Sequence, residues 1–322
     1  MTGKKAGLLV LLEVLREETD EKHVLTCREI LDLVKKRSGI SLNRRTFYSS
    51  LVLLEEHGIE VSKPSDNGKG YYLLRREFEM SEVLMLCNAI HASNFISSAS
   101  SNDLIRKLLA SQSRYERQSF SDAVYLPNRK KTENQELLLN IEVLSESIQK
   151  RLPVSFTYLT YNRKGRLVAR RKEPYITEPR YIVYNDGRGY MICTSPNHPG
   201  FSHYRLDRMK KVVLMDEKTA PLGTDMDPYS YTKSKLFMFA GDNITAELKC
   251  SEKILSQMLD IFGPGTEILD DEEGFFRMHV EAPEQGILWL VQEYLDSITI
   301  LSPQSLKEKH RQILLDALKR ME

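Results

Sequence analysis

The sequence predicts an α+β protein built from four parts, and three observations support this prediction. Apolar residues recur at helical spacing through the first half of the chain, alternate with polar residues as in strands after residue 153, and follow both patterns in turn after residue 243. A chain of 322 residues is long enough for more than one hydrophobic core. We expect the parts at residues 1–76, 77–149, 150–220 and 221–322.

Two helices are expected at the start of the first part. Leucines share one face over residues 4–17, which predicts the first helix. Thr26 and Glu29 form a capping-box pattern, in which each side chain can bond the backbone N–H of the other residue. The second helix therefore begins after Thr26, and Gly39 ends it.

A third helix and a hairpin follow. Asn43 or Ser41 caps the helix, and strands at 59–61 and 71–74 flank a turn at 64–70. Three helices followed by such a hairpin are typical of a winged helix-turn-helix. The apolar residues of the third helix that we expect to face inward are Phe47, Leu51, Val52 and Leu54.

The third helix carries residue types that can read DNA. The N-terminal turns of a docked recognition helix meet base edges, so Arg44 and Arg45 are expected to contact bases or phosphates. Lys69, at the hairpin tip, is expected to reach the backbone or minor groove. The full set expected to contact DNA is Asn43, Arg44, Arg45, Thr46, Tyr48, Ser49 and Lys69. The alternative is that this module, like other trihelical modules, makes a protein–protein contact.

This first part resembles the N-terminal winged helix-turn-helix of DeoR-like regulators. The third helix of that family usually reads S-x-R-T-x-x-R-D-L-x-x-L-E-x-x-G. The residues that match in order are Ser41, Arg45, Thr46, Leu51, Leu54, Glu55 and Gly58. Ser49 and Ser50 replace the Arg-Asp pair of the pattern.

The second part is expected to connect two domains. Residues 79–92, 104–109 and 133–149 have amphipathic helical patterns, and the serine-rich stretch at 97–101 is expected to be a loop. Such helices hold domains apart or pair with their copies in a dimer. We expect a homodimer that binds DNA half-sites one helical turn apart.

The third part holds most of the positive charge. Residues 150–211 contain fourteen Lys and Arg against four Asp and Glu, in a chain whose total charge is +1. Tyrosines and a histidine lie among these cations, which is typical of a surface that binds an anion such as nucleic acid, although a solvated basic face is the alternative. Five short strands with turn residues between them predict a small bent sheet or barrel. The strands are expected at 154–158, 167–171, 181–183, 190–193 and 203–206.

Three segments of this part resemble the WYL domain, an SH3/Sm-like β-barrel that follows such helix-turn-helix modules in bacterial regulators. They are Pro174-Tyr175-Ile176, Gly187-Arg188-Gly189-Tyr190-Met191 and Tyr204-Arg205-Leu206-Asp207-Arg208-Met209. Gly189 stands where the family has Trp.

The resemblance implies a barrel that senses a ligand, often nucleic acid or a nucleotide, through Arg, Tyr and His side chains. Strand alternation puts Tyr204 and Arg205 on opposite faces, so the candidates do not all line one pocket. For Arg208 the alternative is a structural pair with Asp207 or a backbone carbonyl. The candidates are Tyr190, His203, Tyr204, Arg205 and Arg208, with Arg170 and Arg171 as weaker ones.

The fourth part alternates strands and helices in the order of a ferredoxin-like α+β unit with an added helix. It resembles the C-terminal extension that often accompanies the WYL barrel. It is acidic, since residues 212–322 hold 20 Asp and Glu against 11 Lys and Arg. Trp289 is expected in its core or at a dimer interface.

These features predict a cytoplasmic transcriptional regulator that binds double-stranded DNA and whose barrel senses a single-stranded nucleic acid or a nucleotide. The alternative is a scaffold that uses the basic barrel without controlling transcription. No nucleophile, phosphate-loop or metal motif occurs, so no enzyme, metal or cofactor is expected. No signal peptide and no membrane-spanning segment are expected from the sequence. Its four cysteines are far apart and are expected to be free thiols.

Overall fold

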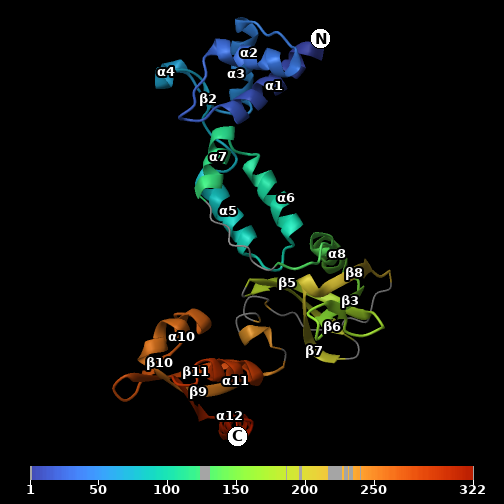
Figure 1. The fold of residues 1–322 in the computed structure, drawn as a ribbon, viewed down its shortest axis with the longest axis vertical. Coiled ribbons are helices and arrows are strands. Elements are labelled where there is room, and N and C mark those ends of the chain that lie inside the picture. The colour runs from blue at the N-terminus through green and yellow to red at the C-terminus, as the bar shows by residue number, and fades with distance from the viewer. Residues whose placement is uncertain are drawn as a thin grey trace. The chain divides into compact units, whose positions relative to one another are not determined.

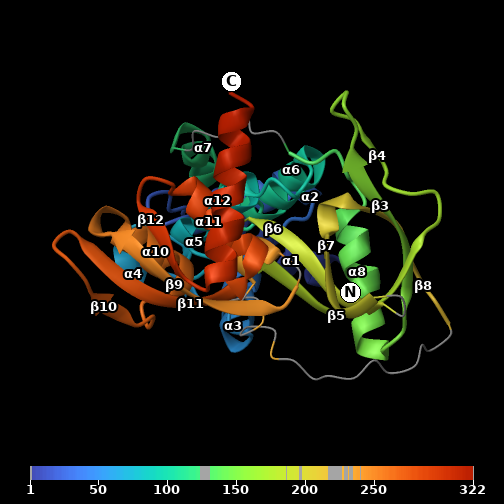
Figure 2. The ribbon, with the colours of Figure 1, turned by 90° about the horizontal axis from the view of Figure 1, so that it is seen from below.

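Helices make up the first part of the chain and a curled β-sheet lies in the second (Figures 1 and 2). The computed structural model describes residues 2–123, 131–185, 187–195, 198–216, 227, 231, 235–239 and 241–321. The chain divides into two compact units, Met1–Gln135 and Glu136–Glu322. The predicted α+β class is confirmed. No helix among the described residues is long and apolar enough to cross a membrane.

Three helices and a two-stranded ladder form the start of the first unit. The side chain of Thr26 accepts from the N–H of Glu29, and the Glu29 carboxylate accepts from Thr26, so the predicted capping box is present. Gly39, with a φ of 71°, ends the second helix as predicted. The elements are α1 (Thr2–Glu18), α2 (Cys27–Ser38), α3 (Arg44–Glu56), β1 (Val61–Ser62), α4 (Pro64–Asn67) and β2 (Tyr72–Leu73).

The core of this segment contains Phe47, Leu51 and Leu54 from α3, as predicted. The prediction for Val52 is wrong, since its side chain is 53% exposed. Val52 follows Leu51 by one residue, which turns it about 100° around the helix and away from the core. Ser50 takes the flank of the buried face instead.

The connecting helices of the first unit are α5 (Met80–Ala92), α6 (Ser98–Leu109) and α7 (Arg114–Ala123). The expected serine-rich loop is wrong: the Ser97 hydroxyl caps α6, and the serines that follow lie in its first turn. Serine competes with backbone groups for hydrogen bonds, so it favours a helix start as much as a loop. The sequence did not predict α7.

Arg76 fastens the first three helices to the connecting helices. Its guanidinium donates to the carbonyl oxygens of Arg16 and Thr19 at the end of α1 (2.9 and 2.6 Å) and of Ser111 after α6 (3.0 Å). The Glu116 carboxylate lies 3.4 Å from its Nε, and only 8% of the Arg76 side chain is exposed. One buried cation thus donates hydrogen bonds to carbonyl groups at the C-terminal ends of two helices.

Two further contacts close the same junction. The Ser113 hydroxyl donates to the buried carboxylate of Asp20 at 2.7 Å, and the His23 ring stacks on Tyr115 at 3.6 Å. Both contacts join the loop after α1 to the start of α7.

The curled sheet of the second unit has six strands rather than the five predicted. Its order is β4-β3-β5-β6-β7, and β8 pairs with the other edge of β3. Val154–Phe156 pair with β5 and Leu159–Tyr161 pair with β4, so these two ladders use different halves of β3, and β8 forms a third ladder with it. The strands are β3 (Val154–Tyr161), β4 (Leu167–Ala169), β5 (Tyr175–Asn185), β6 (Arg188–Ser195), β7 (His198–Arg205) and β8 (Met209–Leu214).

Helix α8 (Leu137–Lys150) lies across this sheet (Figure 2). Its Asn140 is buried and donates to the carbonyl oxygen of Met209 at 2.8 Å. The backbone N–H of Lys211, which has a φ of 53°, donates to Glu136 just before α8. These polar contacts fix the helix against β8.

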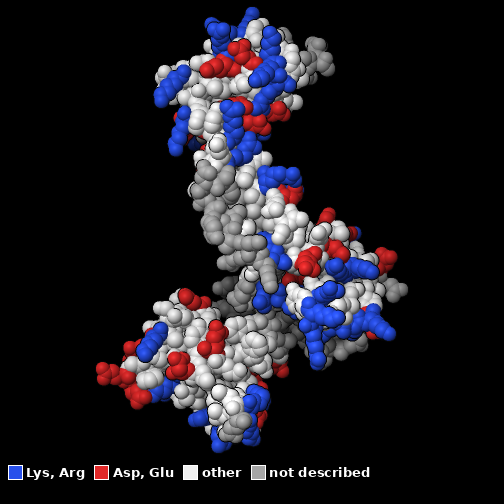
Figure 3. Space-filling view, in the orientation of Figure 1, with Lys and Arg blue, Asp and Glu red and all other residues white. Residues whose placement is uncertain are grey.

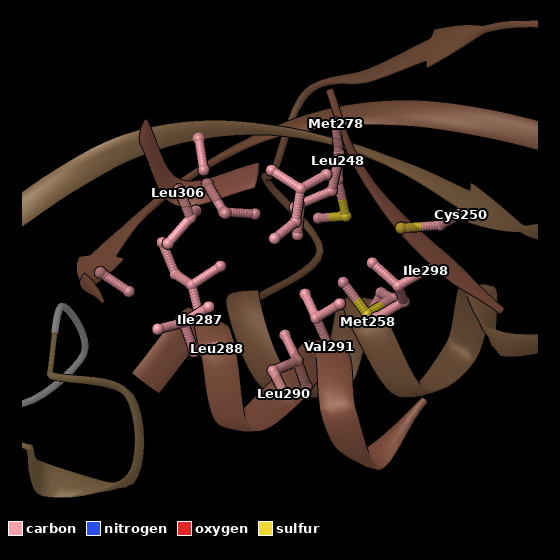
Figure 4. Packing of buried hydrophobic residues seen from close by; sticks show 14 of the residues in the cluster. Leu248, Cys250, Met258, Met278, Ile287, Leu288, Leu290, Val291, Ile298 and Leu306 are labelled. Carbon is pink, nitrogen blue, oxygen red and sulfur yellow. The ribbon is translucent and has the colours of Figure 1, made fainter. Parts of the chain in front are cut away.

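The rest of the second unit is an antiparallel sheet of order β10-β11-β9-β12 with helices on it. Its core is formed by Leu248, Met278 and Ile298 from the strands and by apolar residues of α10 and α11 (Figure 4). Trp289 is 57% exposed, so it is not a core residue as one of our alternatives held. The elements are β9 (Asn243–Ser251), α10 (Leu255–Phe262), β10 (Ile268–Asp270), β11 (Phe275–Pro283), α11 (Glu284–Glu293), β12 (Ile298–Ser302) and α12 (Gln304–Lys319).

A short 3-10 helix, η2 (Leu236–Met238), contacts both parts of the second unit. Met238 packs with Tyr190 and Ile192 of the curled sheet, and Leu236 packs against the core of the other sheet. A Cβ on Gly286 of α11 would come within 3.0 Å of Leu236, so glycine allows this close approach. His203 on β7 holds the same segment through both ring nitrogens, to the Met238 carbonyl at 3.0 Å and to Tyr231 at 2.9 Å.

Arg76→Leu is expected to destabilise the first unit by about 2–4 kcal/mol, because it removes a buried cation and leaves its carbonyl and carboxylate partners without it. Hydrogen–deuterium exchange of α1 and α6 amides measures this loss. The control is Arg75→Leu. The Arg75 side chain is 76% exposed, and its ion pair to Glu60, at 3.4 Å, lies at the surface. That change is expected to cost less than about 1 kcal/mol. Equal losses would contradict the role of Arg76.

The stability of the second unit is expected to fall as the pH drops below about 6.5, the ordinary histidine pKa. Burial lowers the pKa of His203, and the charge on Lys235 acts in the same direction. Below pH 6.5, His203 therefore binds a proton in the unfolded chain, whereas in the folded chain it does so only at a lower pH. The contribution of neutral His203 to the stability of the second unit is thus fully present above pH 6.5 and is lost as the pH falls below it. Guanidinium unfolding, followed by fluorescence of the single tryptophan, measures this.

His203→Gln is expected to reduce the dependence of stability on pH, whereas exposed His279→Gln keeps the wild-type dependence. An unchanged pH dependence in His203→Gln would contradict the assignment.

Candidate nucleic-acid interface and candidate ligand site

The outer face of α3 is the candidate nucleic-acid interface. Arg44, Arg45, Tyr48 and Ser49 are exposed on it, while Phe47 lies beneath in the core. Among the residues that the structure describes, neither arginine forms an ion pair. Both stand in the first turn, where the backbone N–H groups give the helix end a partial positive charge. This end of α3 therefore attracts anions.

Two of the predicted DNA-contacting residues use their side chains within the helix. Asn43 caps α3, since its Oδ1 accepts from the N–H of Thr46 at 2.8 Å, which leaves Ser41 without that role. The Ser49 hydroxyl donates to the carbonyl oxygen of Thr46 at 3.0 Å. Thr46 itself is only half-buried. The arginines are therefore the freer side chains of this turn.

Two further residues predicted to contact DNA are Tyr48, which lies in α3, and Lys69, which follows α4. Tyr48 is 49% exposed and its ring meets Phe47 edge-on at 5.5 Å. Burial, together with the neighbouring Tyr48, raises the pKa of Tyr71 to about 12, so Tyr48 lies close to Tyr71. Lys69 is exposed after α4, and its backbone N–H donates to Asn67.

The register of β6 and β7 sorts the predicted ligand residues between two faces of the curled sheet. Tyr190 pairs with Arg205 and Ile192 pairs with His203, whereas Met191 pairs with Tyr204. Paired residues point to the same side of an antiparallel sheet. Tyr204 therefore lies on the face opposite Tyr190, His203 and Arg205.

The face with Tyr190, His203 and Arg205 is engaged within the chain. Tyr190 is 8% exposed, and both nitrogens of His203 bond the segment around η2. Arg205 donates from Nε and Nη2 to the two oxygens of Asp207, at 3.0 and 2.7 Å. The pair of Asp207 is thus Arg205, not Arg208. These three side chains therefore have contacts within the fold that a ligand would have to replace.

The opposite face gathers aromatic rings that sequence reasoning largely missed. Tyr204 meets Phe156, Tyr158 and Tyr175 edge-on, with ring centroids 5.0–5.4 Å apart. The alternation of Phe156 and Tyr158 along one strand indicated that both rings lie on the same face. Their contact with Tyr204 depends on how the sheet curls, which the sequence does not show. Burial raises the pKa of Tyr204 to about 12, so its hydroxyl stays a hydrogen-bond donor.

One arginine packs on this aromatic cluster, and a second lies close enough to Tyr158 to act on it electrostatically. The Arg171 guanidinium lies 3.6 Å from the centroid of the Tyr175 ring and donates to the carbonyl oxygens of Glu173 and Pro174. The Arg208 guanidinium lies 5.5 Å from the Tyr161 ring centroid, and its buried Nε has no hydrogen-bond partner among the described residues. Arg170 is exposed beside Arg171. Arginine side chains suit a phosphate, and aromatic rings suit a base.

Gly189, where the WYL family has Trp, lies in a space that other side chains fill. A Cβ at this position would come within 2.8 Å of Leu206 and 3.1 Å of Tyr184. Leu206 is fully buried, so it is part of the core. Leu206 and Tyr184 thus fill the space beside the Gly189 backbone, and a larger residue does not fit without moving them.

The basic residues of the second unit are concentrated on the curled sheet (Figure 3). Arg163, Lys164 and Arg166 at the β3–β4 turn and Arg170 to Lys172 after β4 are all exposed. Among the described residues, no group of His, Cys, Asp and Glu could hold a metal ion, and the four cysteines are free thiols.

Comparisons with known proteins agree with the resemblance of the third part. The WYL domain family matches residues 140–214. The chain is also similar to the protein named "Uncharacterized HTH-type transcriptional regulator YobV" of Bacillus subtilis (strain 168), with 21% identity over 284 residues that cover 84% of this chain and 87% of that protein.

Two solved structures show weaker likeness. Proteasome accessory factor B/C (PafBC) of Arthrobacter aurescens is 14% identical, with a TM-score of 0.29, over 98% of this chain and 49% of that one. A CRISPR Cas-related protein is 12% identical, with a TM-score of 0.38, over 99% of this chain and 85% of that one. The chain spans about half of the PafBC chain, and TM-scores of this size do not establish a common fold.

Residues 140–214 of this chain are therefore a WYL domain, in a protein that is similar over most of its length to an HTH-type transcriptional regulator.

Proposed function

We propose that the chain is a DNA-binding transcriptional regulator. The observation that carries this proposal is the exposed face of α3, where Arg44 and Arg45 stand without ion pairs among the described residues. The similarity to an HTH-type transcriptional regulator supports the same function. We assign residues 1–76 to a winged helix-turn-helix whose hairpin is the wing, with Lys69 at its tip.

The other parts are assigned around this head. We propose that two copies pair through the connecting helices α5 to α7, which lie in the predicted part 77–149. We assign residues 150–220, together with α8, to the WYL barrel. Residues 221–322 form a ferredoxin-like domain, a reading supported by the strand order β10-β11-β9-β12 with α10 and α11 between strands. A regulator of this kind acts in the cytoplasm, where bacterial DNA lies.

We propose that the WYL barrel senses a single-stranded nucleic acid or a nucleotide at the aromatic cluster. Arg208 supports this assignment, because a buried Nε without a partner is stabilised when a phosphate oxygen bonds it. Tyr204 has a half-buried ring that could contact a base. Ligand binding changes operator affinity only if the ligand prefers one DNA-binding arrangement over the other.

Arg44→Ala combined with Arg45→Ala is expected to lower specific duplex affinity roughly ten- to a hundredfold, through lost base and phosphate contacts. The operator is first selected from a random DNA pool at a stated salt concentration, and affinity is then measured on it. Arg106→Ala, which removes an exposed arginine of α6, is the control and keeps wild-type affinity. A double variant that binds the selected duplex as wild type does would contradict operator reading by α3.

The same variant separates a regulator from a scaffold. A scaffold would use only the basic barrel, so its binding of nucleic acid would not depend on Arg44 or Arg45. In a regulator these residues determine duplex binding, whereas barrel binding of a single strand is unchanged.

Arg208→Met is expected to weaken binding of a short oligothymidylate or a nucleotide at least roughly tenfold. Fluorescence polarisation of labelled oligothymidylate measures this. Arg163→Met removes an equal charge from the exposed β3–β4 turn and is expected to cost less than roughly threefold. Equal losses would indicate general attraction rather than a site. If no such ligand alters operator affinity or barrel melting, the sensing proposal fails.

A further inference from the structure

One of the exposed side chains of α3 is apolar. Val52 is 53% exposed, and a helix turns about 100° per residue, so Arg45, Ser49 and Val52 fall within a sector of about 60°. The buried residues Phe47 and Leu54 lie on the opposite side of the helix. Any duplex that docks along the exposed face of α3 therefore meets Val52.

We infer that Val52 reads a thymine through its C5-methyl group. This inference rests on the proposed function, because it names the base contact that the α3 face makes in the operator. The thymine methyl is the apolar group at the floor of the major groove, and an aliphatic side chain in contact with it excludes water from both. A base pair without that methyl offers Val52 only polar edges.

The charge along α3 supports a duplex as the partner of this face. Arg44 and Arg45 occupy the N-terminal turn, and the helix dipole adds positive potential there. At the other end, Glu55 is engaged by Lys63 at 2.6 Å, which removes part of the negative charge that would repel phosphates. Glu56 is exposed in the last turn and limits how far the duplex extends along the helix. Val52 lies before that limit.

The spacing of the contacts follows from helix geometry. Seven residues separate Arg45 from Val52, which corresponds to about 10.5 Å along the helix axis. Base pairs are about 3.4 Å apart along the duplex. With α3 lying along the groove, the thymine is therefore about three base pairs from the base pair that Arg45 contacts.

The test uses the full chain and a duplex selected from a random pool. Each thymine is replaced in turn by deoxyuridine, which lacks only the C5-methyl and keeps the Watson–Crick pairing. Wild-type affinity is expected to fall roughly three- to fivefold at one position in each half-site. Val52→Ala is expected to bind the thymine and uracil duplexes equally, at the affinity that wild type has for uracil.

Two controls sharpen the result. Leu53→Ala removes a neighbouring side chain, 40% exposed, that lies outside the sector, and it keeps the uracil penalty. Arg45→Ala changes the base preference at a position about three base pairs from the sensitive thymine. Both exposed positions leave the core intact, so loss of folding does not explain the outcome.

The inference is overturned if Val52→Ala keeps the full uracil penalty, or if no thymine is sensitive in wild type. A change in oligomeric state with an unchanged uracil penalty would assign Val52 to a protein contact instead. If the pool yields no enriched duplex at all, the proposed function fails, and the inference with it.

Discussion

The guanidinium of Arg76 is the contact on which the arrangement of the first unit depends. It bonds the last carbonyl groups of α1 and the carbonyl after α6, and little of its side chain reaches solvent. A buried cation requires its partners in place, because burial without them costs several kcal/mol. The three-helix head and the connecting helices are thus held as one body. A movement of the connecting helices would therefore reorient α3 as a whole rather than deform it.

The curled sheet gives the second unit two chemically different faces. Tyr204 and its aromatic neighbours occupy one, and His203, Tyr190 and Met238 occupy the other. Strand alternation places Tyr204 directly next to His203 in the chain, so a displacement of Tyr204 would move the backbone that holds η2. In the proposed sensor, this would link the aromatic cluster to the segment that packs on α11 without any contact between a ligand and His203.

The sequence predicted what depends on near neighbours and failed where the partners are distant. The Thr26 and Glu29 cap and the Gly39 end involve residues within one helical turn, so their pattern was sufficient. The hydrogen-bond partners of His203, Met238 and Tyr231, lie 35 and 28 residues away in the chain, so the sequence did not reveal them. Asp207 has an arginine nearby on either side in the chain, Arg205 and Arg208, so the sequence alone did not show that Arg205 is its partner. Val52 was predicted to face inward because an apolar residue type alone does not tell which face of a helix it lies on.

Charge alone would have made the barrel the DNA reader, since residues 150–211 carry most of the excess positive charge. Phosphate contacts made by exposed Lys and Arg supply affinity that falls with salt but carry no sequence information. The residues of the β3–β4 turn are of that kind, because their side chains are exposed and stand on a turn rather than on a rigid face. Base reading requires side chains held in fixed relation on a rigid element, which α3 provides. In the proposed regulator, the basic stretch would therefore contribute attraction, and the few ordered side chains of α3 would determine which duplex is bound.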